Sequence, residues 1–279
     1  MVRKIKNSKI KNLIFYPSKL GQSLDGVQLA PSRIVKNIIS NENKKNYIKS
    51  NKTWVNVQKS NDIFESLRLL YIANWKVKGS RINIGGDHSM SIATVAHSLN
   101  NYQNLKLIWI DAHPDINTSY SSISGNIHGM PLGYLTNLDE DDRFDFIGNP
   151  INFKDILYIG IRDIDSFEKK VIKNISYIKP QQFNTWPFLS TVHDFIGNNP
   201  IHISFDVDSL DPQYLSSTGT KVANGLELHR TKILLDYLHK FKKNQIVNVD
   251  ICELNPKLGS LEEYKRSIEN LMYLFDRYI

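Results

Sequence analysis

The segment from Trp109 to Asn117 joins an apolar run to three side chains that can bind a metal ion. The run ends in Asp111, His113 and Asp115. Residues two and four positions apart point to the same side of an extended chain, so these side chains converge if that geometry continues beyond the strand. Buried carboxylates are costly unless they are paired or bound to metal. Oxygen and imidazole ligands together favour a divalent ion such as Mn, Fe, Co or Zn, with a helix-capping turn as the alternative.

Polar side chains also follow three other expected strands. His88 stands in a Gly-Gly-Asp-His-Ser turn, Asp206 and Asp208 directly follow an apolar run, and Glu253 follows another. The four strands are expected at 82–84, 105–110, 201–205 and 246–251. In open parallel sheets, ligands bind beyond the carboxyl ends of the strands. Each turn taken alone also fits a helix cap, but four such strand ends together indicate one shared site.

The number of candidate ligands indicates two metal ions rather than one. The candidates are His88, Asp111, His113, Asp115, Asp206 and Asp208. Two histidines and four aspartates are too many for one ion with an open position, and they suit two ions that share bridging carboxylates. Two such ions, about 3.5–4 Å apart, can activate water and stabilise a transition state. The pattern therefore favours metal-assisted hydrolysis.

Apolar runs alternate with stretches of helical spacing along the chain, which predicts an α/β fold: a largely parallel sheet with helices on both sides. Further strands are expected at 12–16 and 156–161, and helices at 26–39, 62–76, 92–99, 166–173 and 229–242. Ser260 and Glu263 form a capping box that opens a last helix. Segment 41–57 is polar and harder to assign, and 177–199 is expected to hold a strand and a helix. Without a flexible linker, we expect a single domain over residues 1–279 with three α/β/α layers.

Composition excludes several other classes of protein. The 279 residues are 41% hydrophobic and 23% charged, with a net charge of +7. The basic clusters near the N-terminus and at 240–243 have little aromatic interleaving, so we expect solvated surface and no nucleic-acid partner. The single cysteine, Cys252, allows no intramolecular disulfide and favours a reducing compartment. No apolar stretch reaches the roughly twenty residues of a membrane span, and the N-terminus lacks a secretory pattern. We expect a cytoplasmic protein that does not bind membranes.

Taken together, the motifs resemble those of the arginases, in the ureohydrolase family. The resemblance extends from about residue 12 to the end of the chain and keeps the family order. The matching segments are 85–89, 111–117, 124–129, 204–212 and 250–256. It implies an arginase-like fold, two Mn²⁺ ions per chain, and a homo-oligomer, either a trimer or a hexamer.

The same resemblance implies a role for each ligand. One ion would be held by His88, Asp111, Asp115 and Asp206, and the other by Asp111, His113, Asp206 and Asp208. A hydroxide bridging the ions would attack the guanidinium carbon of L-arginine, which gives ornithine and urea. Asp115 would also help to carry the proton to the leaving amine, and Glu253 would pair with the guanidinium. His128 would move protons between solvent and the site, as its near-neutral pKa allows.

Recognition of the amino-acid end of the substrate depends on other positions. By the resemblance, Asn117, Ser122 and Ser124 lie near the α-carboxylate, Asp165 faces the α-amino group, and Glu168 assists through water. A site built to bind a substrate group rejects analogues that lack it, because its own polar groups remain unpaired. These residues favour arginine over agmatine, which has no carboxylate.

One loop departs from the family pattern. Lys221 stands where proline is usual, Asn224 where glycine is usual, and Ser216 replaces another proline. If residue 224 needs a positive φ, asparagine is the least costly residue other than glycine. None of these changes removes a metal ligand, but they leave two alternatives to an arginase open. One is a ureohydrolase for agmatine or another guanidino compound, and the other is a catalytically weak, arginase-like binding protein.

Overall fold

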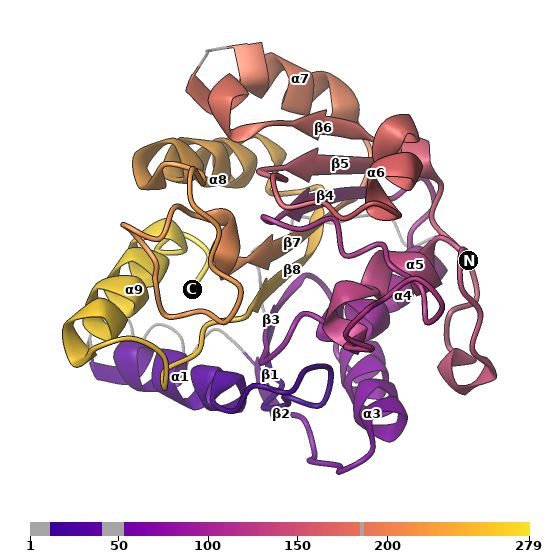
Figure 1. Cartoon of the computed structure of the whole chain (residues 1–279), viewed down its shortest axis with the longest axis horizontal. Helices are drawn as coiled ribbons and strands as arrows, with labels where there is room; N and C mark the ends of the chain where they lie inside the picture. The colour runs from indigo at the N-terminus through magenta and orange to yellow at the C-terminus, as the bar shows by residue number, and fades with distance from the viewer. Residues whose placement is uncertain (1–11, 41–52, 185–186) are drawn as a thin grey trace.

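Eight parallel strands form one sheet through the centre of the protein (Figure 1). The computed structural model describes residues 12–40, 53–184 and 187–279. In sheet order, the strands are β2 (Thr53–Asn56), β1 (Asn12–Phe15), β3 (Arg81–Ile84), β8 (Ile246–Cys252), β7 (Ile201–Asp206), β4 (Lys106–Ile110), β5 (Ile156–Ile159) and β6 (Ser176–Ile178). Because every pairing is parallel, the carboxyl ends of all eight strands lie at the same edge.

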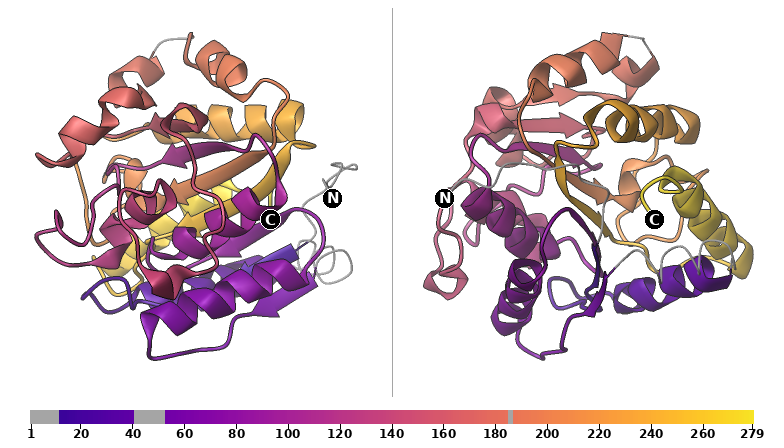
Figure 2. Two further views of the ribbon diagram at one scale, coloured as in Figure 1. Left: turned by 90° about the vertical axis from the view of Figure 1, so that its right-hand side faces the viewer. Right: turned by 180° about the vertical axis from the view of Figure 1, so that it is seen from behind.

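Helices cover both faces of this sheet (Figures 1 and 2). One face packs against α1 (Ala30–Ser40), α7 (Pro187–Ile196), α8 (Leu228–Lys242) and α9 (Leu261–Leu274). The other packs against α3 (Ile63–Lys76), α4 (Met90–Asn101), α5 (Pro131–Leu135) and α6 (Glu168–Val171). Successive residues of β4 alternate between the two layers, with Ile108 in one core and Trp109 in the other, as strand geometry requires. The predicted α/β/α arrangement is confirmed.

Most expected elements are present with small shifts at their ends. Asp62 caps α3 by accepting a hydrogen bond from the backbone N–H of Glu65, and the predicted capping box of Ser260 and Glu263 opens α9. The expected helix at 26–39 begins as a 3₁₀ turn at Val27–Leu29 before α1. The segment 177–199 holds the end of β6 and all of α7, as predicted.

The strand β2 has no counterpart in the expectations. It lies at the edge of the sheet and pairs only with β1 among the described strands. Its residues are half-buried or exposed, so the sequence has no apolar run there. Residues 41–52 of the same unassigned segment lie outside the described residues. The single-domain expectation covers such residues and stays a prediction.

The four central strands are those that the sequence singled out. In the sheet, β3, β8, β7 and β4 are consecutive neighbours. The segments that follow them therefore start side by side at one edge, although they are far apart in the sequence (Figure 1). Four strand ends can deliver side chains to one place because the sheet order interleaves early and late strands.

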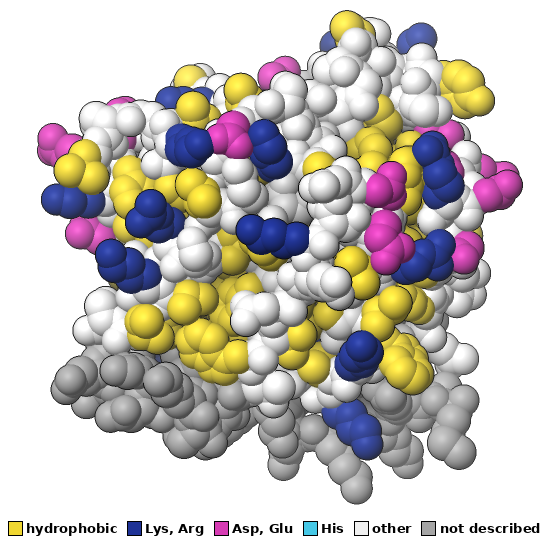
Figure 3. Space-filling view, turned by 90° about the horizontal axis from the view of Figure 1, so that it is seen from below, with side chains coloured by type: hydrophobic (Ala, Val, Ile, Leu, Met, Phe, Trp, Pro, Cys, Tyr) yellow, Lys and Arg dark blue, Asp and Glu magenta, His cyan; other side chains and the backbone are white. Residues whose placement is uncertain are grey.

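Two surface observations bear on partners. Within the described ranges, no helix is both long and apolar enough to cross a membrane. On the face shown in Figure 3, the described Lys and Arg side chains are scattered among apolar and acidic ones. That face therefore presents no continuous basic patch among the residues described.

Candidate metal centre and its cleft

The side chain of His88 lies among three carboxylates at the carboxyl edge of the sheet. Its Nδ1 atom is 3.0 Å from Asp111 Oδ2, 2.9 Å from Asp115 Oδ2 and 3.3 Å from Asp206 Oδ2. Only 1% of His88 is exposed, and Asp111 is fully buried. Residues that follow β3, β4 and β7 thus meet within the reach of one ion, as the sequence predicted.

A second cluster adjoins the first through Asp111. His113 Nδ1 lies 3.2 Å from Asp208 Oδ2 and 3.5 Å from Asp111 Oδ1. The ligand atoms of His113, Asp111 and Asp208 all lie within 4.8 Å of one another. Asp111 therefore offers one oxygen to each cluster, which is the arrangement of a bridging carboxylate.

The backbone after β4 does not continue as an extended chain, so that part of the expectation is wrong. Asp115 has φ = +49°, in the left-handed region. Aspartate tolerates this region better than most residues, at a cost of order 1–3 kcal/mol. The turn brings the Asp115 carboxylate back toward His88, so the predicted convergence is achieved by a reversal of the chain rather than by strand periodicity.

Burial opposes the ionisation of these carboxylates, and the neighbouring charges decide the outcome at each one. Burial raises the pKa of Asp206 well above its usual range, and the charges of Asp208 and Asp111 raise it further. Burial and the charge of Asp111 raise the pKa of Asp115 to about 6. Burial opposes the ionisation of Asp111 too, but the adjacent imidazoles of His113 and His88 outweigh burial and lower its pKa. Two imidazoles cannot neutralise the four clustered aspartates when all four are ionised, so further positive charge is needed to keep them ionised together.

The donor set fits divalent cations. His88 Nδ1 is buried and makes no hydrogen bond to any residue in the described ranges, although three carboxylate oxygens surround it. Its other ring nitrogen, Nε2, lies 2.8 Å from Ser204 Oγ, which fixes the orientation of the ring. A buried imidazole nitrogen that faces carboxylates without a hydrogen bond is a typical metal-ligand position, and its second nitrogen is anchored as metal-binding histidines usually are.

Several supporting residues were not predicted as part of the site. The Trp109 indole stacks on the His88 ring at 4.3 Å between centroids, and its Nε1 donates to Asp111 Oδ2 at 3.1 Å. Ser204 lies two residues before Asp206 on β7, so strand periodicity could have placed both on one side. No local sequence signal identifies Trp109, because its contact with His88 joins β4 to the turn that follows β3.

A cleft of about 210 Å³ opens beside the clusters. It is lined by His113, Asp115, Asn117, His128, Gly129, Asp163, Asp165, Glu168, Asp206, Asp208 and Thr220. Asn117 Nδ2 donates to Asp165 Oδ2 at 2.6 Å. Burial, followed by the charge of Asp115, raises the pKa of Glu168 to about 8. The structure therefore brings Asn117, Asp165 and Glu168 together at the cleft, while their predicted contacts with a substrate stay a prediction.

Two residues of the cleft lining, Thr220 and Asp163, were not predicted as part of the site. Thr220 Oγ1 donates to Asp208 Oδ2 at 2.7 Å, and Asp163 Oδ2 lies 3.7 Å from His113 Nε2. Thr220 belongs to the loop that departs from the family pattern. Each residue contacts a predicted ligand, which makes the cleft and the metal clusters one continuous site.

Ser122 and Ser124 do not line this cleft. They belong to an exposed loop, where Ser122 Oγ accepts from the backbone N–H of Gly125 and Ser124 Oγ from that of Asn126. Ile123 between them is fully exposed. Both hydroxyls thus serve local turns in this structure, and their predicted contact with a substrate carboxylate stays a prediction.

Glu253 and His128 form a pair beside the clusters. His128 Nδ1 lies 3.0 Å from Glu253 Oε1, which also accepts from the His88 backbone N–H at 2.8 Å. Gln22 Nε2 donates to Glu253 Oε2 at 2.7 Å. Burial lowers the pKa of His128, but the hydrogen bond and charge of Glu253 outweigh burial and raise it to about 9. Glu253 is only 2% exposed and lies behind His128 rather than on the cleft wall.

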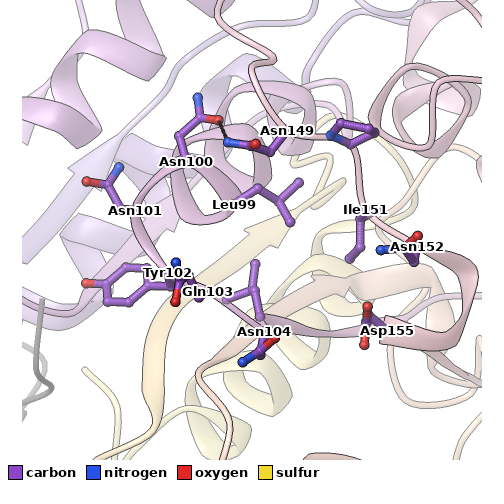
Figure 4. A pocket seen from close by; sticks show the side chains of 12 residues that line it. Leu99, Asn100, Asn101, Tyr102, Gln103, Asn104, Asn149, Ile151, Asn152 and Asp155 are labelled. Carbon is purple, nitrogen blue, oxygen red and sulfur yellow. Dashed lines mark hydrogen bonds between the residues drawn. The ribbon is translucent and has the colours of Figure 1, made fainter. Parts of the chain in front are cut away.

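A larger cavity of about 470 Å³ lies at the opposite edge of the sheet, before the start of β4 (Figure 4). Amide side chains dominate its lining, and Asn149 Nδ2 donates to Asn100 Oδ1 at 3.1 Å. Its one carboxylate, Asp155, is paired with Lys106 at 2.6 Å. This cavity lacks the grouped titratable side chains that mark the smaller cleft.

Comparison with known proteins identifies the family of this chain. A model of the arginase family matches residues 12–274. The arginase of Neurospora crassa is 38% identical over 195 residues, which cover 64% of this chain and 54% of that protein. The arginase of Entamoeba histolytica is 32% identical over 287 residues, covering 94% of this chain and 96% of that protein.

The solved structures show the same likeness. The crystal structure of E. histolytica arginase in complex with L-ornithine matches with a TM-score of 0.83 at 26% identity, covering 97% of this chain and 99% of that one. The chain spans 54–60% of the length of several fungal arginases that it matches. The family model and the E. histolytica relative both extend over nearly the whole chain, and the chain belongs to the arginase family.

Proposed function

We propose that this protein is a two-metal hydrolase that converts L-arginine to L-ornithine and urea. The observation that carries the proposal is the pair of His/Asp clusters joined by Asp111 at the wall of an acidic cleft. One ion would be held by His88, Asp111, Asp115 and Asp206, and the other by Asp111, His113, Asp206 and Asp208. Two divalent cations, which we take to be Mn²⁺, supply water activation at neutral pH and stabilise developing charge.

The cleft suits a substrate with positive charge at both ends. Six carboxylate side chains and no lysine or arginine stand among its lining residues. A guanidinium group binds carboxylates through charge-assisted, often bidentate hydrogen bonds. At the outer end, Asp165 and Glu168 would accept from an α-ammonium group, and Asn117 would donate to an α-carboxylate once its amide turns from Asp165.

Proton movement would use the pair beside the clusters. His128 lines the cleft and is 18% exposed at its side chain, while Glu253 behind it is buried. Glu253 would hold the imidazole in place, and His128 would then exchange protons between solvent and the leaving amine. Asp115 would take a proton from the attacking water, since its carboxylate lines the cleft together with the candidate ligands Asp206 and Asp208.

A second candidate substrate is agmatine, which lacks the carboxylate. The observation that favours it is the position of Ser122 and Ser124 away from the cleft lining. Asn117 would then be the main group to distinguish the two substrates. The relative from E. histolytica was crystallised with L-ornithine, the product expected from arginine, and this supports arginine as the first choice.

The test is urea release from L-arginine and from agmatine by protein loaded with Mn²⁺. Asp111→Ala removes the shared ligand, and Asp155→Ala, in the distant cavity, is the matched control. We expect urea from arginine, loss in Asp111→Ala and full activity in Asp155→Ala. Preference for agmatine would establish the second candidate. Absence of urea from both substrates, with two ions bound per chain, would contradict the proposal. The expected trimer or hexamer stays a prediction that size-exclusion chromatography with light scattering checks.

A further inference from the structure

The guanidinium group of Arg162 is surrounded by backbone carbonyl oxygens. Arg162 follows β5 and lies outside the cleft lining. Its Nη2 donates to the carbonyl of Asp208 at 2.8 Å and to that of Val222 at 2.7 Å. Its Nη1 donates to Ser209 at 3.1 Å and to Gly160 at 3.1 Å. These are charge-assisted hydrogen bonds to oxygens that belong to three different segments of the chain.

The remaining donor completes the set. Arg162 Nε donates to the carbonyl of Ala223 at 3.1 Å, so every nitrogen of the guanidinium is used. Arginine offers five N–H groups in a rigid planar fork, which lysine cannot reproduce with one ammonium group. The planar guanidinium therefore matches the positions of the carbonyl groups around it. A positive charge of another shape would not make the same set of hydrogen bonds.

Apart from Gly160, the carbonyl groups belong to the segment that carries Asp208 and to the loop that follows it. At its base the loop is closed by backbone hydrogen bonds between Ser209 and Leu226 and between Asp211 and Leu226. Arg162 adds contacts within the loop itself, to the backbone carbonyls of Val222 and Ala223. This is where the chain departs from the family pattern. Asn224 there has φ = +61°, the condition under which asparagine is the least costly replacement for glycine.

The loop reaches the metal ligands through one hydroxyl group. Thr220 Oγ1 donates to Asp208 Oδ2 at 2.7 Å, and the same oxygen lies 3.2 Å from His113 Nδ1. Arg162 thus constrains Asp208 twice, at its own carbonyl and through the loop that presents Thr220. We propose that Arg162 is a positioning residue, which holds the 218–225 loop against Asp208 so that one of the two metal sites keeps its shape. The consequence for catalysis rests on the proposed function, but the positioning itself does not.

Lys221 provides a direct probe of the loop. It is exposed and stands beside Thr220, and trypsin cleaves after lysine only where the backbone can leave its folded conformation. In wild-type protein we expect slow cleavage after this residue. In Arg162→Met we expect cleavage there to accelerate at least about tenfold, because local opening tracks the lost contacts. Arg68→Met is the matched control, since Arg68 contacts Asp145 and Arg143 on the opposite side of the fold.

Metal binding provides the second measurement. With added Mn²⁺, electron paramagnetic resonance distinguishes a spin-coupled pair from single ions. We expect wild type to show the coupled pair, and Arg162→Met to bind one ion normally and the other about 10–100-fold more weakly, as loss of supporting contacts typically does. Arg162→Lys should recover only part of this affinity. Thr220→Val should weaken the same ion without releasing the loop to trypsin.

The outcomes separate this inference from the proposed function. If Arg162→Met keeps slow cleavage at Lys221 and both ions at wild-type affinity, the positioning role is wrong. If Arg162→Met does not fold, Arg162→Lys takes its place, and full wild-type behaviour of Arg162→Lys in both assays would overturn the argument from fork geometry. Loss of one ion and faster cleavage in a protein whose wild type releases no urea would support the positioning role while the proposed function fails.

Discussion

The pair of His128 and Glu253 should make the stability of the metal-free protein depend on pH. The two side chains are 3.0 Å apart, and Glu253 is only 2% exposed at its side chain. The pKa of His128 rises from 6.5 to about 9 because Glu253 outweighs the effect of burial. Glu253→Gln removes the charge while keeping an oxygen that can accept from the backbone N–H of His88.

The size and sign of the effect follow from this shift. The difference between about 9 and 6.5, at about 1.4 kcal/mol per pKa unit, corresponds to about 3 kcal/mol of stability. A pKa that is higher in the folded state means that the folded protein binds the proton more tightly. The stabilisation by His128 is therefore fully present below about pH 6.5 and is lost as the pH rises through about 9.

The assay is urea denaturation of wild type and Glu253→Gln, with a chelator present, at several values between about pH 6 and pH 9.5. We expect the wild type to exceed the variant most at the lowest pH, and the difference to shrink by about 3 kcal/mol across this range. Glu140→Gln, on the surface, is the control and should give a flat difference. A constant difference between wild type and Glu253→Gln would refute the reasoning.

Three further predictions each concern a single residue. Asn224→Ala should lower the free energy of unfolding by about 1 kcal/mol, because alanine tolerates φ = +61° less well than asparagine; urea denaturation measures it. Trp109→Phe keeps the stacked ring but removes the donor to Asp111, so the Kd for metal should rise about tenfold by calorimetry, while Trp75→Phe leaves it unchanged. Ser260→Ala should cost about 1 kcal/mol and speed hydrogen exchange in the first turn of α9.

The sequence predicted what depends on local patterns. Largely apolar runs that end in polar residues identified the four central strands, since strands buried on both faces are rich in apolar residues. The polar residues buried inside them, such as Asn83, His202 and Asn248, did not obscure this pattern. The ends of β4 and β7 could be connected because parallel strands share one edge. The edge strand β2 was missed for the same reason, as its half-exposed residues have no such pattern.

What the sequence did not predict depends on contacts between distant segments. The role of Arg162 was not predicted, because the five nitrogen–carbonyl contacts described above reach residues up to 61 positions away. Gln22 lies 231 positions from Glu253, whose side chain it contacts. The turn at Asp115 was missed because an aspartate with a positive φ has no local sequence signature. The prediction instead continued the strand geometry of β4 beyond Ile110, where the strand ends.

The measurement that tests the central claim most directly is the number of divalent ions bound per chain. Protein stripped of metal would be titrated with Mn²⁺ by calorimetry, and the bound metal would then be counted by mass spectrometry. The two clusters joined by Asp111 predict two ions per chain, and Asp111→Asn should weaken both, since its two oxygens face different histidines. Binding of one ion or none by folded wild-type protein, or loss of only one ion in Asp111→Asn, would contradict the account of a shared centre.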